Sequence, residues 1–225
     1  MKSPGFSSTS WIIALGLLLG ALLPATVQAQ EAFEGSFSFA IRLSGKQAPE
    51  FLANEPANVM NMHLKEDNFI IHLSGGRIAR TFLFIGDSNH TYVIDAANRR
   101  AFRRTYFQED STATPPKAKP TGKKIMIKNI ECEEYLVTKS REKTKIYYYV
   151  SDQYRVDTQA YAGKDKAKAD FLTLGLEGRI PLRKIIKTPS LTTEIDLRNA
   201  QPRDLDIENF RIPESFKLRG RDPRK

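Results

Sequence analysis

The chain has 225 residues with 35 lysines and arginines against 26 aspartates and glutamates, which gives a formal net charge of +9. Its single cysteine excludes an intramolecular disulfide, so the fold must rest on an apolar core. This length is compatible with one domain built around a single core.

The N-terminus has the three parts of a secretory signal peptide. Lys2 is followed by an unbroken apolar run, residues 11–23, and by the small-residue site Val27-Gln28-Ala29. A membrane-spanning helix needs about 20 apolar residues, so we expect cleavage of residues 1–29 and no integral membrane anchor. Gln30, rather than a cysteine, follows the site and excludes an acylated N-terminal cysteine. The sequence therefore predicts an exported protein, periplasmic or secreted.

The chain stays basic without this segment, because Lys2 is the only charged residue in it. In an exported protein, a basic balance favours anionic lipid headgroups, acidic polymers or an acidic envelope partner. Nucleic acid lies on the other side of the membrane. We therefore expect an anionic envelope component as a partner, and no nucleic acid.

Alternating apolar residues predict strands in the first half of the chain. In residues 33–43 the odd positions are apolar apart from Gly35, while Ser36 and Ser38 lie between them. Residues 45–57 hold two prolines and favour an excursion or a single helical turn. Further strands are expected at residues 60–64, 69–73, 78–85 and 90–95. Turns recur about every ten residues, the spacing of an antiparallel sheet, a sandwich or an open barrel.

One of these strands, Thr81-Phe82-Leu83-Phe84-Ile85, is apolar on both faces. A strand of this kind needs cover on both sides, so we expect part of the sheet to hold something within its curve.

The densest basic run is residues 99–104, which on a strand would divide its arginines between both faces. Two interpretations remain open. One is an anion-binding rim formed by Arg99, Arg100, Arg103 and Arg104. The other is a solvated edge strand that these charges protect from pairing with another sheet.

The second half of the chain begins with a polar, proline-containing segment, residues 108–122, which we interpret as a flexible loop within one domain, residues 30–218. Residues 123–150 are rich in β-branched and aromatic residues and predict a β-meander around Cys132. Ala167, Phe171 and Leu174 share a helical face, which predicts one main helix near residues 165–174. Strands at 180–186 and 191–197 follow, and residues 219–225 form a basic tail.

The candidate reactive residues do not form a recognisable site. Cys132 is predicted to be a small buried core residue, because Glu131, Glu133 and Glu134 disfavour a thiolate. His63, His72 and His90 lie on separate strands or turns without the close spacing of metal ligands. With no convergent acid-base or nucleophile set, we expect no enzyme, no catalytic residues, no metal and no cofactor.

Two stretches resemble a known family. Residues 130–137 (IECEEYLV), followed by an aromatic strand, and residues 206–216 (DIENFRIPESF) are similar to the secreted bacterial proteins grouped as domain of unknown function 4412. Those proteins are similar in turn to the LolA/LolB-like superfamily of periplasmic lipoprotein carriers. The resemblance implies a mainly β fold, in which a curved antiparallel sheet, an incomplete barrel, wraps around one or two helices with an apolar cavity between them.

Two functions are therefore predicted. The first is a periplasmic binding protein that holds a lipid, an acyl chain or a lipoprotein acyl group in the concave side of the sheet. The alternative is a non-catalytic envelope interaction protein whose cavity is filled by its own side chains. The residues expected to line the cavity are Phe37, Phe39, Phe82, Phe84, Tyr148 and Phe171.

The signal peptide leads to a first prediction. The exported protein should begin at Gln30, because the apolar run is too short to remain as an anchor. Intact-mass measurement of the exported protein tests this. A membrane-bound product that retains residues 1–29 would contradict it.

Overall fold

One β-sheet dominates the computed structural model, which describes residues 32–77, 79–104, 116–139, 142–164, 167 and 169–220. The strands are β1 (Gly35–Ser44), β2 (Val59–Lys65), β3 (Asn68–Ser74), β4 (Arg80–Ile85), β5 (His90–Asp95), β6 (Arg100–Arg103), β7 (Lys119–Ile127), β8 (Ile130–Lys139), β9 (Thr144–Arg155), β10 (Arg179–Lys187), β11 (Thr192–Pro202) and β12 (Lys217–Arg219). The predicted signal peptide, residues 1–29, lies outside the described residues. Among the described residues, no helix is long and apolar enough to cross a membrane.

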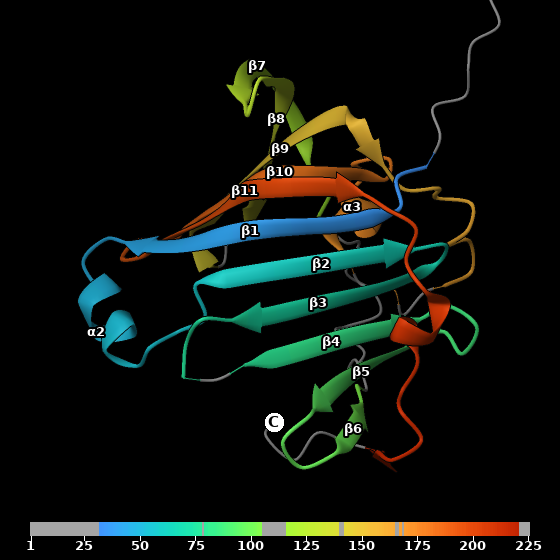
Figure 1. Ribbon diagram of the computed structural model, residues 1–225. Helices are drawn as coiled ribbons and strands as arrows, with labels where there is room; N and C mark the ends of the chain where they lie inside the picture. Colours follow the sequence, from blue (N-terminus) through green and yellow to red (C-terminus); the bar gives the residue numbers. More distant parts are fainter. Residues whose placement is uncertain are drawn as a thin grey trace, which may run out of the picture. The chain divides into compact units, whose positions relative to one another are not determined.

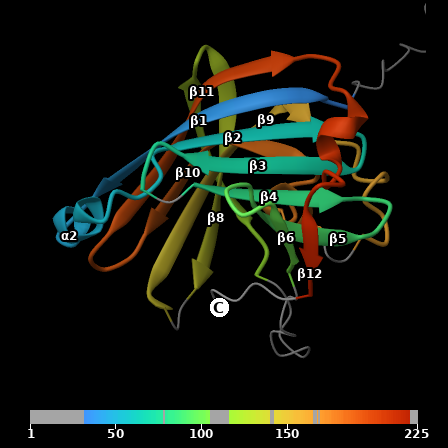
Figure 2. The ribbon, with the colours of Figure 1, turned by 60° about the horizontal axis from the view of Figure 1, so that its bottom comes forward.

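The sheet is open and strongly curved (Figures 1 and 2). Within the described residues its order is β12-β6-β5-β4-β3-β2-β1-β11-β10-β9-β8-β7, with β12 and β7 at opposite edges. All neighbouring strands are antiparallel except β12 and β6, which are parallel. The predicted mainly β fold, a curved antiparallel sheet that forms an incomplete barrel, is therefore confirmed.

Both α-helices of the described residues are short. The helical turn expected in residues 45–57 is α2 (Ala48–Ala53), which exposes Phe51 and Leu52 at one end of the sheet (Figure 1). The helix expected near residues 165–174 is only α3 (Asp170–Thr173), so its predicted length is wrong. Ala169 has an extended backbone and is buried, which delays the start of the helix to Asp170. Residues 165, 166 and 168 lie outside the described residues.

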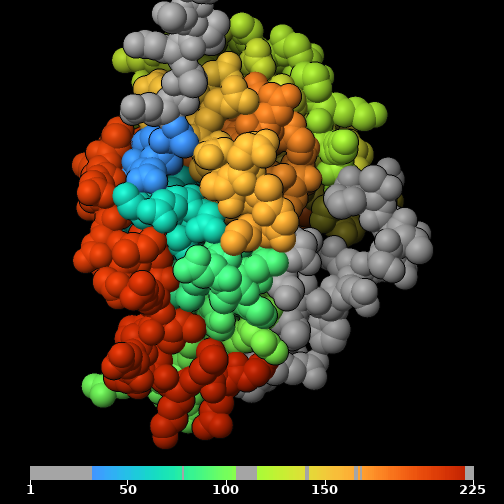
Figure 3. All heavy atoms as spheres, turned by 90° about the vertical axis from the view of Figure 1, so that its right-hand side faces the viewer, coloured from blue at the N-terminus to red at the C-terminus, as the bar shows by residue number. Residues whose placement is uncertain are grey.

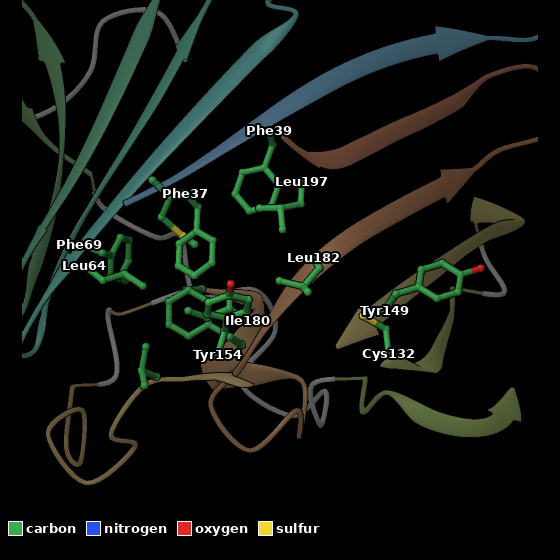
Figure 4. Packing of buried hydrophobic residues seen from close by; sticks show 14 of the residues in the cluster. Phe37, Phe39, Leu64, Phe69, Cys132, Tyr149, Tyr154, Ile180, Leu182 and Leu197 are labelled. Atoms are coloured by element: carbon green, nitrogen blue, oxygen red, sulfur yellow. The ribbon is translucent and has the colours of Figure 1, made fainter. Parts of the chain in front are cut away.

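The inner, concave face of the sheet is filled by the chain's own aromatic and aliphatic side chains (Figure 4). The rings of Phe69 and Phe84, directly opposite each other on β3 and β4, stack with centroids 5.1 Å apart. Phe171 of α3 packs edge-on against Phe69, with ring centroids 6.1 Å apart. Tyr161 stacks against Phe84, with ring centroids 6.3 Å apart. The segment that follows β9 thus closes the inner side.

The outer face of the same strands is covered by the C-terminal segment, residues 203–216. Its 3-10 helix η3 (Ile207–Phe210) places Phe210 against Ile70 and Leu83, which lie directly opposite each other on β3 and β4. Figure 3 shows this segment (red) and the segment after β9 (gold to orange) on opposite sides of the strand ends (blue to green). The chain itself therefore supplies the cover that the two-sided apolar strand requires.

Two predictions about loops and edges are corrected. Residues 119–122 of the predicted loop at 108–122 belong to β7, and residues 108–115 lie outside the described residues. Pro120 is tolerated there because β7 is an edge strand, and its register shifts near Gly122, which has a φ of +80°. β6 is not an edge strand, because residues 217–219 of the predicted chain end pair with it as β12 (Figure 2).

The outer cover gives a stability prediction. Phe210→Ala should lower the free energy of unfolding by about 3–5 kcal/mol, because Phe210 is only 1% exposed and the substitution leaves a cavity. Urea unfolding measures the effect. Leu218→Ala is the control, since Leu218 is 60% exposed and its truncation should change stability by less than about 0.5 kcal/mol. Equal effects of the two variants would contradict a second core on the outer face.

Candidate functional site

The aromatic residues predicted to line a ligand cavity are packed within the protein. Phe37, Phe39, Phe84 and Phe171 belong to the inner cluster, at 0–3% exposure. Tyr148 lies in a neighbouring cluster with Val137 and Leu176. Phe82 is half-buried, with the Arg104 guanidinium 5.7 Å from its ring centroid. Contact of these six residues with a ligand stays a prediction.

The four arginines of the predicted anion rim are distributed around β6. Arg99 lies in the preceding turn with a φ of +48°, Arg100 and Arg103 are exposed on β6, and Arg104 follows it. None of them lines the cavity described next. An anion-binding rim of these residues stays a prediction.

A cavity of about 410 Å³ lies between the outer face of β2 to β5 and the C-terminal segment. Its walls are mostly apolar, and its polar end contains two histidines and an arginine. The lining residues are His63, Ile70, His72, Thr81, Leu83, Ile94, Arg203, Leu205, Asn209, Phe210, Arg211, Pro213 and Phe216. This is the candidate functional site.

Strand register brings the two histidines together. The turn at Glu66 and Asp67 joins β2 to β3 so that His63 lies opposite Ile70 and their side chains share the outer face. His72, two residues further along β3, is a diagonal neighbour, and the ring centroids are 5.6 Å apart. In the sequence His63 alternates with the apolar Met62 and Leu64, which predicts it on the polar side of its strand. Its proximity to His72 depends on the pairing of β2 with β3.

Hydroxyl groups hold both rings. The Ser36 hydroxyl on β1 is 2.7 Å from His63 Nδ1, and the Thr81 hydroxyl on β4 is 2.9 Å from His72 Nδ1. Arg203, which directly follows β11, donates from Nε to Ser36 Oγ at 2.9 Å. Sequence reasoning missed Arg203, because only the pairing of β11 with β1 places it beside His63.

Burial and neighbouring positive charge favour the neutral imidazoles. Burial lowers the pKa of His63 first, and the nearby His72 and Arg203 lower it further. Burial also lowers the pKa of His72. Both rings therefore change charge below the ordinary imidazole pKa of about 6.5.

The site has an incomplete set of catalytic groups. Ser36 and His63 are within the distance of a nucleophile and its base. However, none of the described residues that line the cavity is a carboxylate that could orient His63 or stabilise an imidazolium. The described residues also contain no group of three or more His, Cys, Asp or Glu side chains that could hold a metal ion.

The environment of the single cysteine disfavours the reactive thiolate form. Cys132 is fully buried on β8, as predicted, and burial raises the pKa of its thiol to about 11. Glu131 raises it further, in the direction expected from the sequence, although burial is the larger cause.

A second cavity, of about 620 Å³, lies beside α2. Most of its wall is formed by the chain connecting α2 to β2 and by the turn at Gly75 and Gly76. Arg42 in its wall is ion-paired with Asp196 and Glu194, so its charge is already compensated. Arg42 therefore does not give this cavity a free positive charge for a ligand.

No protein-family model and no curated protein matches the chain. Among solved structures, an uncharacterised conserved protein from Thermus thermophilus is similar over 84% of this chain and 91% of that chain, at 7% identity and a TM-score of 0.49. PNGF-II matches 84% of this chain but 31% of its own, at 8% identity and a TM-score of 0.49. The Mycobacterium tuberculosis lipoprotein LppX matches 77% of this chain and 90% of its own, at 11% identity and a TM-score of 0.36. Similarities this weak assign no function.

The histidine pair predicts a pH dependence of stability. The folded state lowers both pKa values, so the neutral rings contribute stability that is fully present above the unfolded pKa of about 6.5. This stability is lost as the pH falls below that value and through the lowered pKa values of the folded state. The variant with His63→Gln and His72→Gln should therefore lose less unfolding free energy than the wild type between about pH 7.5 and about pH 5.5. Urea unfolding at the two pH values measures this, and identical losses would contradict it.

Proposed function

We propose that the chain is an exported, non-catalytic binding protein that holds an apolar ligand, such as a lipid, an acyl chain or a lipoprotein acyl group, against its curved sheet. The observation that carries this proposal is the cavity under the C-terminal segment. Its volume of about 410 Å³ is within the range of small-molecule sites, about 300–1,000 Å³, and its walls are mainly apolar.

The ligand site proposed here is on the outer face rather than in the concave side expected from the sequence. The concave face is packed with the chain's own side chains, whereas the outer cover leaves space between Leu83, Phe210 and Phe216. Burying an acyl chain would contribute about 0.8 kcal/mol for each methylene group. Several methylenes would give useful affinity before any polar contact is added.

The signal-peptide pattern supports a periplasmic or secreted location. We also infer membership of the domain of unknown function 4412 family, within the LolA/LolB-like superfamily, from the two stretches that resemble it. In the structure the first of these is β8 and the second is the segment around η3 that covers the outer face.

The second candidate is an envelope interaction protein with a self-filled cavity. The packed inner face favours it, because Phe37, Phe84 and Phe171 are at most 3% exposed there. The two candidates differ in whether the folded protein binds a free amphiphile.

A binding prediction separates them. The purified protein should bind a dansyl-labelled undecanoic acid probe, and Ile94→Trp should weaken binding by about tenfold or more, because the larger ring fills the outer cavity. Fluorescence titration measures the affinity, and native mass spectrometry of the untreated protein detects co-purified lipid.

Two matched variants locate the ligand. Ile41→Trp narrows the second cavity, and Phe82→Ala truncates an inner-face side chain, so neither should weaken binding as Ile94→Trp does. A stronger effect of Phe82→Ala would return the ligand to the concave side. If the folded protein binds neither the probe nor a panel of lipids, the interaction-protein candidate replaces the carrier.

A further inference from the structure

We propose that His63, His72 and Arg203 form an oxyanion subsite at the polar end of the outer cavity, with Arg211 at its rim, which receives the carboxylate or phosphate headgroup of the bound amphiphile. This inference rests on the proposed function for the apolar part of the cavity. The new part is the chemical class of the ligand's headgroup, an oxyanion.

The charge of the lining is the first support. Among the described residues, two arginines and two histidines line the cavity, and no carboxylate does. Arg211 is ion-paired with Glu208 at 2.7 Å, which leaves Arg203 as the cation whose charge is not compensated by a carboxylate among the described residues. Nearby Glu34 and Asp204 both pair with Lys65 at 2.8 Å rather than with Arg203.

Arg203 is held in place by neutral groups. Its Nε donates to Ser36 Oγ at 2.9 Å, and its Nη2 lies 3.5 Å from His63 Nδ1. Among the described residues it forms no ion pair with a carboxylate. The terminal nitrogens of its guanidinium therefore keep N–H donors for a ligand, in the fork geometry that matches carboxylate and phosphate oxygens.

The hydrogen-bond order makes His63 a donor as well. Ser36 Oγ accepts from Arg203, so its own proton can be donated to His63 Nδ1. A neutral ring that accepts at Nδ1 carries its proton on Nε2. His63 thus presents an N–H to a partner, and an anion accepts such a hydrogen bond where a cation would not.

The same groups set the pH dependence of binding. Within the described part of the cavity wall, the charged or titratable groups near His63 are His72 on β3, Arg203 after β11 and Arg211 in the C-terminal segment, and none of them is a carboxylate. A bound anion favours the imidazolium, so its affinity should rise as the pH falls toward the histidine pKa values. A neutral ligand should show the opposite trend or none.

Calorimetric titration with ligands of one chain length tests the proposal. The probes are dodecanoate, dodecyl phosphate, neutral dodecanol and dodecyltrimethylammonium, all below micellar concentration, together with acetate and inorganic phosphate. The two anionic amphiphiles should bind about tenfold or more tightly than dodecanol, as expected for charge-assisted hydrogen bonds. The difference should shrink at high salt. For dodecanoate, whose carboxylate stays ionised in this range, it should grow between about pH 8 and about pH 6.

Arg203→Gln should remove most of the preference for dodecanoate over dodecanol, because it removes the guanidinium that binds the headgroup. Arg198→Gln is the matched control, because Arg198 is exposed on β11, carries the same charge and does not line the cavity. Urea unfolding of both variants checks that each is folded.

The outcomes separate this inference from the proposed function. Equal binding of dodecanoate and dodecanol, unaffected by Arg203→Gln, overturns the oxyanion subsite and leaves the apolar site intact. Binding of acetate or inorganic phosphate that depends on Arg203, without binding of any dodecyl ligand, supports the subsite and overturns the lipid carrier. Preferential binding of dodecyltrimethylammonium overturns the subsite directly.

Discussion

Coverage of both faces of the curved sheet is the constraint on which the rest of this structure depends. On β4, Leu83 and Phe84 are adjacent and point to opposite faces, yet they are 3% and 0% exposed. Leaving either side in water would lose about 25 cal/mol for each Å² of apolar surface. The chain meets this requirement with two separate segments, one on each face.

The two covers differ in how completely they fit. The inner cover brings aromatic rings from β1, β3, β4 and α3 into one cluster with close ring contacts. The outer cover is a single irregular segment with one turn of 3-10 helix, whose first turn is capped by the Asp206 side chain accepting from the backbone of Glu208. A segment of this kind anchors Phe210 but cannot follow the whole curved surface. The outer cavity lies where the cover is incomplete.

The polar end of this cavity follows from the same geometry. β11 ends at Pro202, and the chain must turn there to reach the outer face, which brings Arg203 over Ser36 and His63. Cross-strand pairing places Ser36, His63, Ile70 and Leu83 in one row on that face. The polar half of the site, at Ser36 and His63, is therefore next to its apolar half, at Ile70 and Leu83, in this row.

The sequence by itself determined the local structure. Alternation of apolar residues predicted strands such as β1, because a strand with one buried face needs that period. Apolar runs bounded by turn residues predicted β4, and β-branched and aromatic content predicted β8 and β9. The sequence also predicted a buried Cys132 and the faces of Ser36 and His63. These features depend on residues close together in the chain, where side-chain type and backbone preference are sufficient.

Only the tertiary structure decided which distant segments of the chain contact those strand faces. Arg203 and His63 are separated by 140 positions, and their contact depends on the pairing of β11 with β1 and of β1 with β2. The extended Ala169, which shortens the expected helix to α3, is likewise fixed by burial against the sheet. The candidate cavity lies on the outer face, under the C-terminal segment, for the same reason. Which segment covers which face is decided by long-range packing, and no local pattern encodes it.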